Sequence, residues 1–174
     1  MFSTFSLRFS VLICLLLFNI AAAENHQKSF KPVDLKITTH LGDNQKFREG
    51  DQISFMISLD HAAYIYLFYQ DVNAQIVQLL PNQHQHSIIY KPGFFIPIPD
   101  QNSQFNFTIQ EPFGEDSVWV FATDSPVPEL DGTILKNGLK LLNLTIDQIR
   151  SKIKYQVKSI YGESSIPVFT EAEQ

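Results

Sequence analysis

Cysteine and glycine are both scarce in this chain. The 174 residues include one cysteine, Cys14, and seven glycines. An internal disulfide is therefore excluded, and so is a zinc site built on cysteine pairs. No Gly-rich phosphate-binding loop and no Gly-x-Ser-x-Gly nucleophile motif is present. The sequence thus lacks the motifs of disulfide scaffolds, P-loop enzymes and the common serine hydrolases, and we expect no cofactor.

Positively charged residues are also few. Lys and Arg number 13 against 18 Asp and Glu, which gives a formal net charge of −5. Binding to nucleic-acid phosphates needs clustered Lys and Arg, and a mildly acidic surface does not supply them. We therefore expect no nucleic-acid partner.

The N-terminus has the three-part layout of a secretory signal peptide. Arg8 precedes an uncharged, mostly apolar run over residues 11–23, which ends in three alanines and turns polar at Glu24. The small residues suit cleavage after Ala23, and the run is too short to span a bilayer comfortably. Cys14 follows Ile13 rather than a small residue, which disfavours a lipid anchor. We predict a periplasmic or secreted protein.

Cleavage would leave one domain of 151 residues and would take the net charge from −5 to −6 through the loss of Arg8. A chain of this length can bury a single sizeable core. No second apolar run of about 18 residues follows, so we expect no transmembrane segment after cleavage. The predicted organisation is a signal peptide over 1–23, a flexible leader over 24–32 and a β-sandwich domain over 33–170.

The rest of the chain reads as short strands separated by turns. Apolar and polar residues alternate with the period of two that half-buried strands show, whereas residues 63–69 are apolar on both faces. The predicted strands lie at 33–39, 53–58, 63–69, 75–80, 94–99, 104–109 and 117–122. This spacing predicts a mainly β fold, a single antiparallel immunoglobulin-like β-sandwich. The expected core includes Tyr64, Tyr66, Phe68, Trp119 and Phe121.

One segment near the C-terminus has helical period. Apolar residues recur three or four positions apart from Ile146 to Ile160, which predicts an amphipathic helix at about 145–161. Thr145 and Gln148 fit a capping box, and Gly162 fits a stop. Residues 166–169 are expected to add a final edge strand.

The middle of the chain resembles an uncharacterised family of bacterial envelope domains labelled only as a domain of unknown function. The matching stretches are Phe47-Arg48-Glu49-Gly50-Asp51, Ala63-Tyr64-Ile65-Tyr66-Leu67-Phe68, Asp71, Val77-Gln78-Leu79-Leu80-Pro81-Asn82, Glu111-Pro112-Phe113-Gly114-Glu115-Asp116 and Phe121-Ala122-Thr123-Asp124-Ser125-Pro126. The resemblance covers about residues 33–126 and implies an exported β-sandwich module. It brings no catalytic residues with it. In the turn after Asp71, Asn73 stands where a glycine is common, and asparagine tolerates positive φ.

Residues capable of chemistry are present but do not form a recognisable catalytic set. His84 and His86 are weak metal candidates, since three or four ligands would be needed and a polar turn explains them equally. Asp71 begins a calcium-like motif but lacks the glycine and glutamate that such a loop requires. The loop carboxylates of Glu111, Glu115 and Asp124, with His61, are the candidates for acid–base hydrolysis.

Two segments fit a partner surface. Phe94, Phe95, Ile96 and Ile98 form an apolar extended segment that either finishes the core or lies at a sheet edge, where a partner strand could add. Arg150, Lys154 and Lys158 form a basic row on the predicted helix, which either is simply solvated or meets anionic lipid or an acidic partner.

The sequence therefore favours a non-catalytic, exported interaction or accessory module of the bacterial cell envelope, for instance one serving a secretion or envelope-assembly system. Its expected partner is an envelope protein, and peripheral membrane contact is compatible with the basic row. The alternatives are an envelope glycan or peptide hydrolase and a small-ligand or glycan-binding domain.

Overall fold

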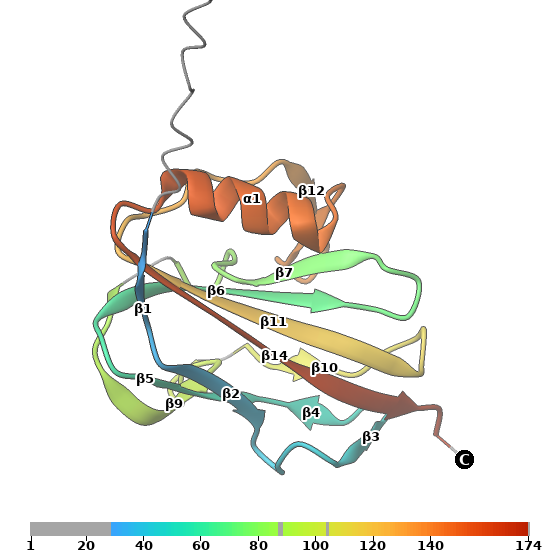
Figure 1. Ribbon diagram of the computed structural model, residues 1–174. Helices are drawn as coiled ribbons and strands as arrows, with labels where there is room; N and C mark the ends of the chain where they lie inside the picture. The colour runs from blue at the N-terminus through green and yellow to red at the C-terminus, as the bar shows by residue number, and fades with distance from the viewer. Residues whose placement is uncertain (1–28, 87–88, 104, 174) are drawn as a thin grey trace, which may run out of the picture.

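The computed structural model describes residues 29–86, 89–103 and 105–173 and arranges them in three layers (Figure 1). Helix α1 (Ile146–Gln156) lies over a nine-stranded sheet, and a smaller layer of strands lies beneath that sheet. The main sheet has the order β1 (Lys31–Pro32), β14 (Ile160–Glu171), β11 (Glu115–Thr123), β6 (Ala63–Gln70), β7 (Ile76–Leu80), β13 (Lys140–Leu142) and β12 (Gly132–Ile134), with β3 (Lys46–Arg48) paired to β14 and β8 (Ile89–Tyr90) to β6.

The lower layer consists of two small sheets. The larger has the order β2 (Leu35–Thr39), β5 (Phe55–Leu59) and β9 (Gly93–Ile98), and the smaller pairs β4 (Gln52–Ile53) with β10 (Phe107–Thr108). All pairings are antiparallel except the short ones that β14 makes with β1 and β3. The mainly β architecture, its antiparallel sheets and the single helix near the C-terminus are as the sequence predicts.

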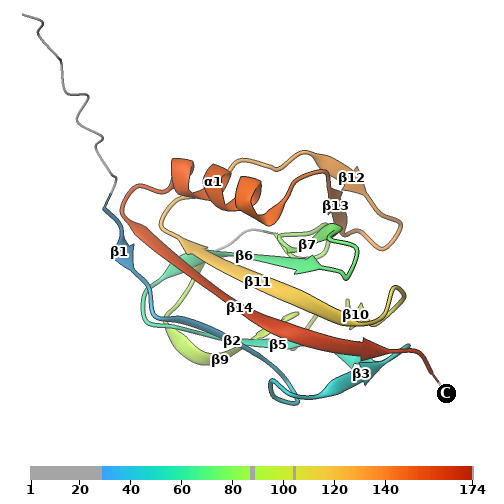
Figure 2. The same cartoon turned by 45° about the vertical axis from the view of Figure 1, so that its right-hand side comes forward.

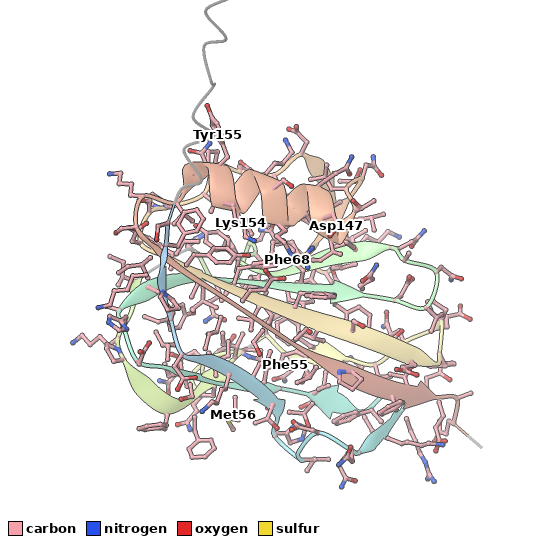
Figure 3. The ribbon with its side chains drawn as sticks, in the orientation of Figure 1. Phe55, Met56, Phe68, Asp147, Lys154 and Tyr155 are labelled. Atoms are coloured by element: carbon pink, nitrogen blue, oxygen red, sulfur yellow. The ribbon has the colours of Figure 1, made fainter. Side chains whose placement is uncertain are left out.

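Strand β6 shows why its sequence is apolar on both faces. Ile65 and Leu67 belong to the core between the two strand layers, whereas Tyr66 and Phe68 belong to the core beneath α1. Figure 3 shows the two cores, with Phe68 below the helix and Phe55 in the lower layer. A strand covered on both sides reads as a continuous apolar run, so the prediction for this segment is confirmed.

The expected core is confirmed for three residues of five. Tyr66, Phe68 and Phe121 are buried, and Phe68 and Phe121 meet edge to face with ring centroids 5.8 Å apart. Tyr64 and Trp119 are only half-buried and pack against the edge of the helix-side core. Both contribute less apolar burial than the sequence predicts.

The helix begins as predicted and ends earlier. The Thr145 side chain accepts a hydrogen bond from the Gln148 backbone, and the Gln148 side chain accepts one from the Thr145 backbone, so the capping box is present. The helix ends at Gln156, before the apolar spacing runs out. Gly162 is not its stop, because this glycine lies inside β14, where a side chain would clash with Val33.

Strand β14 is the largest departure from the predicted architecture. Residues 166–169 do lie in a final strand as predicted, but β14 runs for twelve residues and pairs with β11 on one side and with β1 and β3 at its two ends on the other, so it is not a short strand at the edge. The leader also differs at its end, where Lys31–Pro32 pairs with β14. The predicted signal peptide lies outside the described residues. In the part of the chain that the structure describes, no helix has the length and apolar composition needed to cross a bilayer.

The turn between β6 and β7 uses a different residue for its positive φ. Ala74 has a φ of 62°, whereas Asn73 is not in this region of the Ramachandran plot. The Asp71 side chain holds the turn by accepting hydrogen bonds from the backbone of Asn73 at 2.9 Å and Gln75 at 2.8 Å. The expectation that Asn73 takes the left-handed position is therefore wrong by one residue.

Candidate functional site

Two phenylalanines at the start of β9 are exposed side by side. Phe94 has 83% and Phe95 73% of its surface accessible. Regular alternation would place Phe94 on the inner face with Ile96 and Ile98. Phe95 instead has a φ of 57°, a conformation that non-glycine residues adopt only at a cost, and the alternation breaks there. We call Phe94 and Phe95 the apolar tip.

The rest of the predicted apolar segment is less accessible to a partner. Ile98 is completely buried between the layers and Ile96 is half-buried. The segment is therefore both core and edge: its C-terminal half finishes the core, and its N-terminal half is exposed. The prediction of a partner contact at Ile98 is wrong, because no surface of this side chain reaches solvent.

Strand β9 is an edge strand, but its edge is poorly suited to strand addition. Among the described strands, the order of the small sheet gives β9 a partner on one side, β5. Pro97 lies in the middle of the strand and has no N–H to donate, as is common on protected edges. The tip therefore offers side chains rather than a main-chain ladder, and strand β9 lies on the opposite side of the molecule from the C-terminus (Figure 1).

The predicted basic row on α1 is largely engaged within the molecule. The Nε of Arg150 lies 2.7 Å from Oε1 of Glu163, and its guanidinium lies over the ring of Trp119 at 5.4 Å. The bond with Glu163 raises the pKa of Arg150. A second ion pair joins Arg150 to Asp147.

The other two residues of the row differ from each other in exposure. Nζ of Lys154 lies 4.9 Å from the centre of the Tyr161 ring, under the helix, while Tyr155 points away from the sheet (Figure 3). Lys158 is exposed. The three predicted residues therefore do not form one basic surface, because Arg150 and Lys154 turn toward the sheet.

A second surface feature is an open groove of about 380 Å³ on the underside of the main sheet. Val77 of β7 and Leu139 and Leu141 from the segment around β13 line its floor, and Phe105 and Phe107 line its wall. The floor is apolar and only partly covered, since Val77 and Leu141 remain half-buried. We call this feature the β10 groove.

The conspicuous carboxylates of the sequence mostly hold turns together. Asp124 accepts hydrogen bonds from the backbone of Lys158 at 3.1 Å, Ser159 at 2.7 Å and Ile160 at 3.1 Å. Burial favours the protonated form of Asp124, but these bonds and one from the Ser159 hydroxyl outweigh it and hold its pKa well below the usual range. Asp124 thus fastens the α1–β14 loop to the end of β11.

The candidate acid–base residues do not converge. Glu115 begins β11 and Asp124 follows its end, so the nine-residue strand separates them by roughly 30 Å. Glu111 is near Glu115 in the chain but far from Asp124 for the same reason. His61 contacts Asp60 at 2.8 Å and the Lys31 ammonium at 2.7 Å, with none of the three carboxylates among these contacts.

Among the residues that the structure describes, Asp116 is the one deeply buried carboxylate, and its Oδ2 atom links three strands. It accepts hydrogen bonds from the Tyr69 hydroxyl and from Oγ1 of Thr170 at 3.0 Å, which link β6, β11 and β14. Burial raises the pKa of Asp116, and burial together with the neighbouring carboxylate raises that of Tyr69. No local sequence pattern links the members of this trio, because Tyr69 and Thr170 lie 47 and 54 residues from Asp116 in the chain.

The two weak metal candidates lie on a turn. The ring of His84 stacks on Phe105 with centroids 4.6 Å apart, and its Nε2 lies 3.0 Å from the Asn137 carbonyl oxygen. His86 is exposed. Among the residues that the structure describes, no group of three or more His, Cys, Asp and Glu side chains is placed to hold a metal ion.

Comparisons with known proteins locate the resemblance without adding a function. No curated protein and no solved structure matches the chain. Residues 46–126, a little under half of the chain, match the family model described as Domain of unknown function (DUF4384), in agreement with the uncharacterised family that the sequence resembles.

Proposed function

We propose that this protein is a non-catalytic, exported interaction module of the bacterial cell envelope, and that it contacts a protein partner through the apolar tip. The observation that carries the proposal is the paired exposure of Phe94 and Phe95 on a strained backbone. Exposed aromatic anchors are typical of interface hot spots, and a costly conformation is retained where it serves a function.

The arrangement of the remaining polar groups supports a non-catalytic role. Asp71, Asp116 and Asp124 use their carboxylates to fasten turns and strands, and Glu115 and Asp124 lie at opposite ends of β11. A hydrolase needs two groups within reach of one substrate bond. The candidate carboxylates lack that arrangement.

The proposed export rests on the N-terminal pattern and is tested separately. If the pattern acts as a signal peptide, the protein recovered from the periplasm or culture medium begins at Glu24, as N-terminal sequencing would show. Recovery of the chain in the cytoplasm with residues 1–23 still attached would contradict export.

The tip is tested by photo-crosslinking in the envelope fraction. A photoreactive amino acid at position 94 is expected to capture one specific protein, and capture is expected to fall at least tenfold in a chain that also carries Phe95→Ser. The matched control places the probe at Tyr155, an equally exposed aromatic residue on α1. The same products from both positions, or none from position 94, would overturn the proposal.

A second candidate function, ligand binding, is favoured by the β10 groove. The groove combines aromatic side chains with an apolar floor, as small-molecule and peptide sites do. The residues that line the groove also indicate which class of ligand it would bind.

A further inference from the structure

The main sheet is wider than the layer that covers its underside. β2 packs beneath β14, and β5 and β9 continue the lower layer toward the middle of the sheet. β12 and β13 extend beyond β7, next to α1, whereas β10 lies in the lower layer (Figure 2). The β10 groove lies between the β10 segment and the inner faces of β7 and β13, where Val77 and Leu141 remain only half-buried.

In the part of the chain that the structure describes, the strand beside the groove has an unpaired main-chain edge. β10 pairs with β4 on one side only, with Phe107 opposite Ile53. The backbone N–H of Ile109 donates to the Asp51 carbonyl at 2.9 Å, so residues 107 and 109 direct their main-chain groups toward β4. By antiparallel alternation, the N–H and C=O of Thr108 point the other way. Thr108 is exposed and lines the groove.

The charge of the groove is of one sign. Its lining includes two charged residues, and both are acidic: Asp71 and Glu111. Gln75, Asn106 and Gln110 add amide groups along the rim. The groove therefore combines a free main-chain edge, an apolar floor and an acidic end.

We propose that the β10 groove binds an extended, basic segment of a partner protein, which adds as a strand to the free edge of β10. Alternate side chains of the segment would cover Val77 and Leu141, and a Lys or Arg would meet Asp71 and Glu111. This is peptide recognition by strand addition, in which main-chain bonds provide affinity and alternate side chains provide specificity. The segment would complete the lower layer under β13. The proposal concerns a different surface from the apolar tip and does not depend on it.

The test measures fluorescence anisotropy with the full chain and a labelled nine-residue peptide that alternates valine and threonine between two terminal lysines. Saturable binding is expected at low salt. The same peptide ending in glutamate should bind at least fivefold more weakly, because the groove is acidic. A peptide with alternate backbone amides N-methylated should lose at least tenfold in affinity, because it cannot form a ladder.

Two protein variants locate the site. Thr108→Pro removes the outward N–H without touching the bonds to β4 and should weaken binding at least tenfold, while Thr108→Val keeps the N–H and should bind as the parent does. Glu111→Gln should reduce the preference for the lysine-ended peptide. The double variant Phe94→Ser/Phe95→Ser should bind the peptide unchanged, which separates this site from the tip.

Several outcomes would overturn the proposal. Equal affinity for the N-methylated and unmodified peptides would exclude strand addition, and this readout stands even if Thr108→Pro fails to fold. Undiminished binding by a folded Thr108→Pro chain, loss of binding in the tip variant, or no binding of the lysine-ended peptide would each refute the site.

Discussion

At the scale of single residues, Ala74 has a left-handed backbone conformation that suits glycine better than alanine. An alanine at a φ of 62° stores strain that glycine would not, since the Cβ atom crowds the carbonyl in this conformation. Ala74→Gly is expected to raise the free energy of unfolding by about 0.5–1 kcal/mol, with the backbone entropy of glycine offsetting part of the relief. Urea denaturation measures the change.

The matched control for Ala74 is the reverse substitution at Gly50. Gly50 has a φ of 85° in an exposed turn, and a Cβ there would meet no atom within 4 Å. Gly50→Ala should therefore lower the free energy of unfolding by about 1 kcal/mol through backbone strain alone. A loss of stability in Ala74→Gly would show that the turn is not strained.

Asp124 makes stability depend on pH in a defined direction. Its pKa is depressed in the folded state, so the stability it contributes is present above the unfolded pKa of about 4 and is lost as the pH falls through the folded pKa. Asp124→Asn is expected to lower the free energy of unfolding at pH 7 by about 2 kcal/mol, because bonds to a charged acceptor are replaced by weaker ones.

Denaturation of both proteins between pH 7 and pH 3 tests this expectation. The difference between parent and Asp124→Asn should shrink as the pH falls below about 4. Asp131→Asn, which changes an exposed carboxylate, should leave the profile nearly unchanged. A difference that stays constant across the range would mean that Asp124 acts through packing rather than charge.

At the scale of elements, α1 is attached to the sheet by a narrow apolar face. Ile149 and Ile153 are completely buried against the helix-side core. Ile153→Ala is expected to lower the free energy of unfolding by about 2–4 kcal/mol through lost burial and the cavity left behind. Its exposed neighbour Lys152→Ala should change it by less than about 0.5 kcal/mol. Thermal or urea unfolding distinguishes the two, and equal effects would contradict this view of the helix.

Local patterns predicted the elements whose signals are local. The β6–β7 hairpin follows from an apolar run and a turn, and the start of α1 follows from its capping box. The end of α1 and the beginning of β14 were not predictable in the same way. Val157 and Ile160 continue the helical spacing by coincidence, although Val157 is a cap and Ile160 is already in a strand.

The two candidate surfaces also depend on features that local sequence patterns do not show. Exposure of Phe94 depends on the φ of Phe95, and no neighbouring residue in the sequence signals a left-handed phenylalanine. The β10 groove depends on how many strands each layer contains, which is decided by pairings between distant segments. For residues 94–99 the sequence indicated an apolar, Pro-containing segment that could lie at a sheet edge, but not which of its side chains are exposed.

At the scale of the whole molecule, the segment matched by the family model is not a complete fold. β14 lies beyond residue 126 and pairs with β11 along the entire length of that strand, from Glu115 to Thr123. A chain that ends at residue 126 would leave this edge and the helix-side core open to water. We expect it to lack a cooperative unfolding transition and dispersed amide resonances, whereas a chain covering 29–174 should show both. A cooperative transition in the shorter chain would disprove this.

The placement of β14 also has a consequence for timing. A ribosome delivers this strand after the other described strands, yet it lies beside one of the longest strands of the main sheet, so the three-layered state cannot form until residue 171 has been synthesised. The N-terminal pattern predicts that the chain is directed through a membrane. If so, the polypeptide would reach the translocation machinery still unfolded, and no chaperone would have to unfold it first.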